Sequence, residues 1–389
     1  METLKRNCIC CGADSGQIIP LGKYSVAGVG EIDAKLKICD ACGCLMQDPV
    51  PAPEAMAKYY KVLSNYTNAS RDGLPDPNTL KANRRQLALI DDLPKLGRAY
   101  EIGCATGHML SELKKLGWNV NGCDPSPSAA KVAKDLWDIQ IQTGQFEEMS
   151  LAPGGVDLVL MMHVLEHVHN PVDFLGKAAS LLAENGSLLI EVPCLIRPDK
   201  WGNGYFTFEH INIFSENALL SCLSRAGFQA LAIKIDAESE PYPVITALAR
   251  KTGANKPFPV RPDDPEAVAA MVKAYLKTDA SEWMRIDNLL ANELLGVDEV
   301  ILWGGGVHTS QLFSHTAAIH AVDIKYVIDS DPQKHGLKIE GVEIRGIDFV
   351  SLVNDIVPII ISSKAYEEEI YLYLRKELQL KTKIVRLYN

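Results

Sequence analysis

The stretch at residues 101–107 constrains the fold of this chain more strongly than any other part of the sequence. It reads EIGCATG, and it lies between a short apolar run and an amphipathic helical pattern. In such a strand–turn–helix context, glycines let the backbone pass close to a bound nucleoside. Asp124 ends the next apolar run, where a carboxylate can accept hydrogen bonds from both ribose hydroxyls of an adenosine. Together the two features predict a nucleotide site at the edge of a parallel sheet.

Apolar runs and amphipathic segments continue to alternate from about residue 97 to residue 250. This alternation predicts a parallel sheet wrapped by helices, because each helix must bury its apolar face against the sheet. Ser215 has the side chain of a helix N-cap, and residues 229–236 and 243–250 read as a closing hairpin. We expect an α/β fold with a Rossmann-like core whose strands end at Gly103, Asp124, Gly144, Met162 and Val192.

The remainder of the chain adds three predicted parts around this core. The proline-rich run from Asp48 to Pro53 marks a boundary, because proline continues neither a helix nor a central strand. A second α/β pattern contains the run VILWGGG from Val300, and Asp329 follows its next strand, which predicts a small Rossmann-like C-terminal domain. The predicted parts are a cysteine-rich module at 1–53, a helical connector on the substrate side at 54–96, the core at 97–250, and a helical linker plus the second Rossmann-like domain at 251–389.

Six of the ten cysteines precede residue 45, and four of these form two Cys-x-x-Cys-Gly knuckles. In each knuckle two thiolates point at one ion and the glycine permits the turn. Cys10 and Cys44 do not fit this spacing. We predict a closed, structural zinc site, with two chance thiol pairs as the alternative; its ligands would be Cys8, Cys11, Cys39 and Cys42.

Charge and hydrophobicity limit the kinds of molecule that this protein is expected to bind. The formal net charge is −10 and no run of lysine or arginine occurs, which argues against a nucleic-acid surface. No apolar stretch approaches the roughly 20 residues that span a bilayer, and the N-terminus lacks a signal-peptide pattern. We expect a cytoplasmic protein, monomeric or weakly dimeric, that binds a small-molecule substrate, no nucleic acid and no membrane.

The core resembles the class I S-adenosylmethionine-dependent methyltransferases over about residues 97–250. An acidic residue opens the Gly-rich turn, and the fourth strand runs into the sequence Leu165-Glu166-His167-Val168. Ala105 replaces the middle glycine of the family's turn. The resemblance implies that Gly103 and Gly107 cradle the methionine moiety, that Asp124 holds the ribose, and that His163 lies beside the sulfonium. The full predicted cofactor set is Glu101, Gly103, Cys104, Ala105, Gly107, Asp124, Pro125, Gln145, Phe146, His163 and His167, with Gln145 and Phe146 flanking the adenine.

Glu209 and His210 follow the fifth strand, at the edge where open α/β sheets bind ligands. A histidine there is suited to remove a proton at neutral pH, and the adjacent carboxylate could tune it. The alternative is that His210 only packs or orients a loop.

The whole arrangement, with a four-cysteine module, a core carrying Glu-His-x-x-x-Phe-Ser, and a C-terminal Rossmann-like domain, resembles the sugar C-methyltransferases of deoxysugar biosynthesis. That resemblance implies a nucleotide-linked 4-keto sugar as substrate. It also implies that His210, with Glu209 beside it, removes the C3 proton to give an enolate that attacks the methyl group. The family's stretch is Tyr-His-Glu-His, whereas this chain has Thr207 and Phe208 in the first two places. Tyrosines elsewhere could supply the missing phenol or could simply pack: Tyr59, Tyr60, Tyr66, which we include in the predicted catalytic set, and Tyr205.

The C-terminal domain is expected to close over the nucleotide part of the acceptor, through Trp303 and His308, or to be a structural remnant. Two other functions stay open. One is O- or N-methylation of a sugar, polysaccharide or natural product. The other is a non-catalytic scaffold, which the intact turn and Asp124 argue against. An NAD-dependent dehydrogenase is disfavoured, because no dehydrogenase-like catalytic set accompanies either glycine turn.

Overall fold

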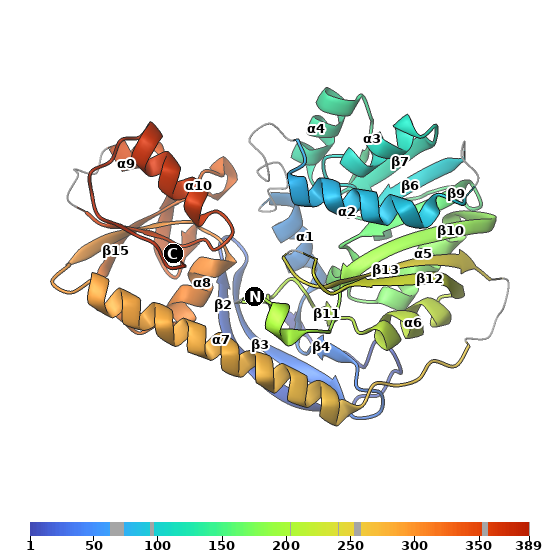
Figure 1. Ribbon diagram of the computed structural model, residues 1–389, viewed down its shortest axis with the longest axis horizontal. Coiled ribbons are helices and arrows are strands. Elements are labelled where there is room, and N and C mark those ends of the chain that lie inside the picture. The colour runs from blue at the N-terminus through green and yellow to red at the C-terminus, as the bar shows by residue number, and fades with distance from the viewer. Residues whose placement is uncertain are drawn as a thin grey trace.

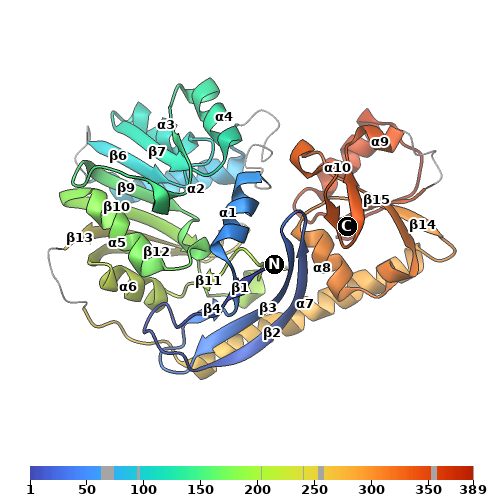
Figure 2. The ribbon, with the colours of Figure 1, turned by 180° about the vertical axis from the view of Figure 1, so that it is seen from behind.

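The computed structural model describes residues 1–62, 74–93, 97–202, 204–239, 241–252, 258–351 and 357–388. Its central α/β part and its C-terminal α/β part form two lobes (Figure 1), and a long hairpin near the N-terminus and the helix α7 (Pro265–Glu293) run between them. Figure 2 shows the same two connections from behind. In the described part of the chain, no helix is both long and apolar enough to cross a bilayer.

A seven-stranded sheet forms the central lobe, in the order β12-β13-β10-β9-β6-β7-β8. From β10 to β8 neighbouring strands are parallel, and β13 closes the sheet antiparallel to β10, with Ile190 opposite Ala247. Residues 158–161 of β9 are all buried, as expected for a strand covered on both faces. The five predicted strand ends are confirmed to within one residue, and the closing hairpin is confirmed as well. The strands are β6 (Arg98–Ile102), β7 (Asn119–Asp124), β8 (Gln142–Thr143), β9 (Val156–Met162), β10 (Leu182–Pro193), β12 (Phe228–Asp236) and β13 (Val244–Lys251).

Helices cover this sheet and begin with recognisable caps. Ser215 accepts a hydrogen bond from the amide of Ala218 and so caps α6, as predicted. Ser126 and Asn170 cap α4 and α5 in the same manner. The helices are α2 (Pro77–Leu87), α3 (His108–Lys115), α4 (Pro127–Trp137), α5 (Pro171–Leu181) and α6 (Glu216–Arg225). In the connector, α1 (Pro53–Val62) precedes α2.

The N-terminal residues build a four-stranded sheet in the order β11-β4-β3-β2, with β2 (Gly16–Val26), β3 (Gly30–Cys39), β4 (Leu45–Gln47) and β11 (Asn212–Ile213). A short ladder also joins β1 (Thr3–Leu4) to β5 (Val50–Pro51). The strand β11 belongs to the central part of the sequence, and its Asn212 pairs with Met46 of β4. The predicted module at 1–53 is therefore not self-contained. Its sheet is completed by a strand just after His210.

The C-terminal lobe has a six-stranded sheet in the order β16-β17-β15-β14-β18-β19, parallel except for the β16–β17 pair. It confirms the second α/β pattern. The amide of Ser25 in β2 donates to the hydroxyl of Ser310 in α8 at 2.6 Å, so the N-terminal hairpin contacts this lobe directly. The elements are β14 (Glu299–Trp303), α8 (Val307–His315), β15 (Asp323–Ile328), β16 (Lys338–Ile339), β17 (Val342–Arg345), α9 (Asp348–Ser351), β18 (Ile359–Ile361), α10 (Glu367–Leu372) and β19 (Ile384–Val385).

Candidate functional site

The turn after β6 adopts a conformation that its residue types explain. Gly103 has φ of +70°, and a Cβ there would lie 2.5 Å from Cγ2 of Val164. Only glycine fits this position without displacing Val164. Ala105 also has a positive φ, +43°, which is unusual for a residue with a side chain. Its amide donates to Oδ2 of Asp124 at 2.9 Å, and this hydrogen bond accompanies the strained turn.

Asp124 lies at the carboxyl end of β7 and is 2% exposed. Besides the bond from Ala105, its Oδ1 accepts from the amide of Ser126 at 2.8 Å. Burial raises the pKa of Asp124 to about 6. Each carboxylate oxygen keeps a further lone pair, so the group is held in place and can still accept two ribose hydroxyls.

A pocket of about 710 Å³ opens beside this turn and runs along the carboxyl ends of β6, β7 and β9. This is where open α/β sheets bind ligands. Most of the predicted cofactor residues line it: Gly103, Ala105, Asp124, Pro125, Gln145, Phe146, His163 and His167. Three further lining residues were not predicted, because they lie outside the turn motifs. Val164 follows β9, and Phe174 and Lys177 lie on α5.

Three members of the predicted cofactor set do not line the pocket. The side chain of Cys104 is buried in a core cluster with Leu110 and Ile139. Glu101 is buried at 3% exposure, and burial together with the charge of Asp124 raises its pKa well above the usual range. Gly107 begins α3 at φ of +75° and shapes the turn through its backbone. Glu101 and Cys104 therefore lie outside the pocket lining, and their part in cofactor binding stays a prediction.

Phe146 has both of the roles that its sequence context suggested. It lines the pocket, and it is also 3% exposed and packs edge-to-face on Phe174 at 5.0 Å between ring centroids. It can therefore border an adenine while belonging to the core.

His163, directly after β9, lies between two buried carboxylates. Its Nδ1 is 3.4 Å from Glu166 and its Nε2 is 3.4 Å from Glu191. Burial disfavours the charged imidazole, but the two carboxylates outweigh that effect and raise the pKa of His163 to about 10. Arg85 of α2 binds both oxygens of Glu191, at 2.8 and 2.9 Å. Sequence reasoning missed Arg85 and Glu191, since no motif links residues 106 positions apart.

The predicted catalytic pair, Glu209 and His210, contacts His167. Nδ1 of His167 is 2.8 Å from the hydroxyl of Tyr60 and 3.0 Å from the backbone carbonyl of Glu209. The rings of His167 and His210 are 5.0 Å apart. Tyr59 donates to Oε1 of Glu209 at 2.9 Å. Burial lowers the pKa of His210 to about 3 and raises the pKa of Glu209.

The remaining predicted substrate residues fall in different places. Tyr66 lies outside the described residues. Tyr205 is 7% exposed and stacks on Trp201 at 4.8 Å, in a cluster that packs on α7, so it is a packing residue rather than the predicted contact. Tyr59 and Tyr60 do lie at the site, as the contacts above show.

In the C-terminal lobe, Trp303 is 5% exposed and packs in the core with Tyr373, because β14 is a central strand covered on both faces. This corrects its prediction as a ligand contact. His308 is bound at both ring nitrogens, to Ser362 at 3.0 Å and Tyr388 at 2.6 Å. Both contacts hold the histidine within its own lobe.

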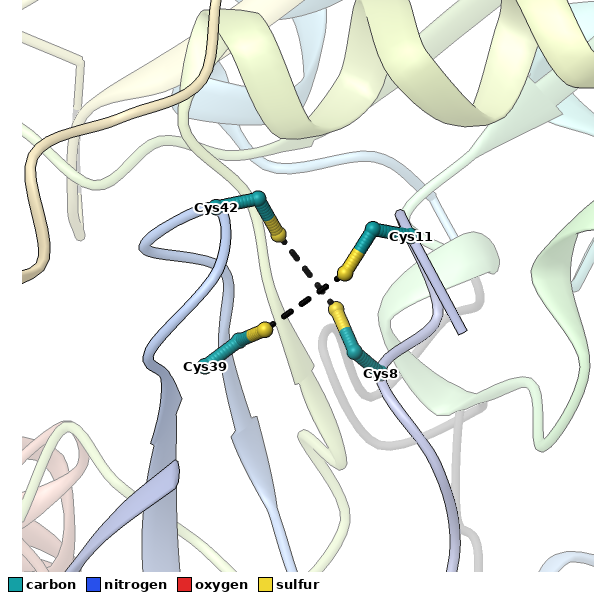
Figure 3. A group of neighbouring side chains, drawn as sticks. All are labelled: Cys8, Cys11, Cys39 and Cys42. Atoms are coloured by element: carbon teal, nitrogen blue, oxygen red, sulfur yellow. Dashed lines mark hydrogen bonds between the residues drawn. The ribbon is translucent and has the colours of Figure 1, made fainter. Parts of the chain in front are cut away.

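The four predicted zinc ligands converge, and Figure 3 shows their sulfurs pointing at one another. The sulfurs of Cys8 and Cys42 are 3.5 Å apart, as are those of Cys11 and Cys39. A tetrahedral zinc site with bonds of about 2.3 Å places its sulfurs at roughly this spacing. Cys10 and Cys44 lie outside the group, and their sulfurs contact the carbonyls of Ala218 and Leu45.

The sequence was compared with family models and with known proteins, and the matches are to methyltransferases. Residues 76–233 match the family model described as a methyltransferase domain. The ubiquinone biosynthesis O-methyltransferase of Cupriavidus pinatubonensis is 28% identical over 153 residues, which cover 36% of this chain and 59% of that protein. Its mitochondrial counterpart in Schizosaccharomyces pombe is 35% identical over 97 residues, covering 23% of this chain and 35% of that protein. The chain thus spans less than two thirds of the length of either relative.

Among solved structures, the 1,6-didemethyltoxoflavin-N1-methyltransferase of Burkholderia thailandensis, with bound 1,6-didemethyltoxoflavin and S-adenosylhomocysteine, is similar to this chain. It is 19% identical at a TM-score of 0.42, and the match covers 56% of this chain and 96% of that one. The turn at Gly103 and the carboxylate of Asp124 both lie within the residues that match the family model. The central part of the chain is therefore a class I S-adenosylmethionine-dependent methyltransferase domain.

Proposed function

We propose that the protein transfers a methyl group from S-adenosylmethionine to a small-molecule acceptor. The observation that carries this proposal is the fixed carboxylate of Asp124 beside the turn at Gly103, in the lining of a pocket of about 710 Å³. The reaction needs mainly alignment, because the sulfonium is already a good leaving group and the enzyme must bring the acceptor in line with the methyl.

We further propose a nucleotide-linked keto-deoxysugar as acceptor, methylated on carbon. The support is the likeness of the chain's three-part arrangement to the sugar C-methyltransferases, together with the contact of the Glu209–His210 pair with His167, which lines the pocket. In this reaction the carboxylate of Glu209, beside His210, accepts the proton of the carbon next to the ketone. The resulting enolate carbon forms a bond to the methyl group, the carbon–sulfur bond breaks, and its electron pair stays on sulfur as S-adenosylhomocysteine.

A second candidate function is methylation of oxygen. It is favoured by the curated relatives, which are O-methyltransferases of ubiquinone biosynthesis. The same cofactor site would serve, and the base would act on a hydroxyl.

Zinc bound by the four cysteines would be structural in this proposal. Four thiolates fill a tetrahedral shell and leave no position for a substrate or a catalytic water.

The test is mass spectrometry of methyl transfer to nucleotide-linked keto sugars and to their reduced hydroxyl counterparts, with exchange of the proton beside the ketone followed in deuterated water. Methylation of the keto form with exchange, both lost in Glu209→Gln, supports carbon methylation. Methylation of hydroxyl acceptors without exchange would establish the second function instead. Failure to bind S-adenosylmethionine in calorimetry would remove both.

A further inference from the structure

We propose that Glu166, His167 and His210 form a binding site for a divalent metal ion beside the pocket that His167 lines. One ligand atom from each of the three lies within 4.8 Å of the other two. Glu166 and His167 come from the short helix at Leu165–His167 after β9, and His210 comes from the loop before β11. Two imidazoles and one carboxylate are a ligand set for divalent transition metals, and they leave other coordination positions open.

The carboxylate of Glu166, which faces the imidazole of His163 on one side, is the first independent sign of a further ligand. It is 1% exposed, and neither of its oxygens has a hydrogen-bond partner among the described residues. The nearest imidazole nitrogens are Nδ1 of His163 at 3.4 Å and Nε2 of His167 at 3.9 Å. Both distances exceed a normal N–H···O bond, and a buried carboxylate without close donors is costly. An ion among these side chains would satisfy it.

The imidazole of His167 is oriented as in known metal sites. Its Nδ1 faces the backbone carbonyl of Glu209 at 3.0 Å. The hydroxyl of Tyr60 lies 2.8 Å from the same nitrogen and can accept as the carbonyl does, so a proton on Nδ1 satisfies both contacts. In that tautomer the lone pair is on Nε2, which lies 3.9 Å from Glu166. Metal-binding histidines commonly donate their second ring nitrogen to such a carbonyl or carboxylate.

The loop that carries His210 is also fixed from outside. Nε2 of Gln47 in β4 donates to the backbone carbonyl of His210 at 3.0 Å, and Arg6 donates to the carbonyl of Ile211. No hydrogen bond to another described residue engages the ring of His210. The backbone is thus held in position while both ring nitrogens stay available for a ligand.

The ion would lie beside the cofactor pocket, because His167 lines the same pocket as Gly103 and Asp124. Its open positions could bind a keto or hydroxyl oxygen of the acceptor, which acidifies the proton to be removed and stabilises the oxyanion. With His210 as a ligand, the carboxylate of Glu209 remains to accept that proton. This chemical role rests on the proposed function, whereas metal binding itself does not.

The test is a titration of the full chain, with zinc already on its cysteines, by Mn²⁺ followed by electron paramagnetic resonance. Mn²⁺ binds oxygen ligands such as a carboxylate, is a poor match for four thiolates, and gives a paramagnetic signal. We expect one Mn²⁺ per chain, and an affinity at least about tenfold weaker in Glu166→Gln and in His210→Gln. His169→Gln is the matched control, since this nearby imidazole binds the carbonyl of Pro51 at 2.7 Å and should leave the affinity unchanged.

Absence of Mn²⁺ binding, or equal binding in both ligand variants, would overturn the proposal. Circular dichroism and zinc content check that each variant is folded, and His210→Gln decides if Glu166→Gln does not fold, because His210 is only partly buried. Calorimetry with S-adenosylmethionine separates the two proposals. Cofactor binding without Mn²⁺ removes only the metal site, and Mn²⁺ binding without the cofactor removes only the proposed function.

Discussion

The amide of Ala105 donates a hydrogen bond to Oδ2 of Asp124 at 2.9 Å, which joins the turn after β6 to the end of the neighbouring strand β7. The second oxygen of Asp124 is held by the amide of Ser126. The carboxylate is therefore fixed by two backbone donors before any cofactor arrives. Such preorganisation reduces the ordering cost of binding and directs the remaining lone pairs into the pocket.

Replacing this carboxylate should weaken cofactor binding. Asp124→Asn removes the negative charge and replaces one acceptor oxygen by an NH₂ group. That donor would face the backbone amide of Ala105 or Ser126, which is also a donor, and could no longer accept from a ribose hydroxyl. We expect the affinity for S-adenosylmethionine to fall about 10- to 100-fold, or roughly 1.4 to 2.8 kcal/mol. Isothermal titration calorimetry measures this, and Asp135→Asn on the exposed face of α4 is the control. Equal affinities in the two variants would show that Asp124 does not hold the ribose.

The raised pKa of Asp124 predicts a dependence on pH. Since its pKa in the folded protein is about 6, the carboxylate becomes protonated as the pH falls through 6, and affinity for the cofactor should fall with it. The unliganded protein should respond in the opposite direction. A carboxyl whose folded pKa lies above its unfolded value binds more protons when folded, so its contribution to stability increases as the pH falls from about 6 towards 4. Calorimetry from pH 5 to pH 8 tests the first effect, which should be absent in Asp124→Asn.

The cofactor turn could be predicted because its determinants are local. A strand, two glycines and a carboxylate one strand later are all encoded within residues 101–124, and the structure places them together. The zinc ligands were predictable for the same reason, since two short knuckles define the spacing of their sulfurs.

The cluster around His163 could not be predicted in this manner. The packing of α2 on the sheet brings Arg85 to Glu191, and the pairing of β9 with β10 brings Glu191 to His163. Likewise, β11 is a two-residue strand without a periodic signal, although it completes the N-terminal sheet and positions His210. Trp303 misled the sequence interpretation, because a tryptophan beside a glycine turn looks like a ligand contact until the central position of β14 is known.

Removing the metal from the cysteine site should destabilise the N-terminal sheet. We expect Cys39→Ser to lose one zinc per chain, measured by mass spectrometry under native conditions, and to lower the melting temperature, because metal binding and folding are coupled in such sites. The effect should extend to the loop of His210, since β11 pairs with β4 of the same sheet. Cys10→Ala, which lies outside the four-sulfur group, should keep its zinc. Zinc retained in Cys39→Ser would contradict the predicted ligand set.

A pair of glycine substitutions separates backbone strain from collision in the cofactor turn. Gly103 and Gly154 have nearly the same φ, +70° and +69°, so alanine at either position incurs a similar backbone cost of about 1 to 2 kcal/mol. Only at Gly103 would the new methyl group collide with a neighbour, Cγ2 of Val164 at 2.5 Å, whereas nothing lies within 4 Å at Gly154.

Urea unfolding should therefore show a greater loss of stability in Gly103→Ala than in Gly154→Ala, and calorimetry should show weaker cofactor binding only in the former. Trimming the neighbour in the double variant Gly103→Ala, Val164→Ala should recover part of the affinity, because it removes the collision but not the strained φ. If both single variants lost the same stability and bound the cofactor equally well, close packing of Val164 against the turn would have no part in shaping the site.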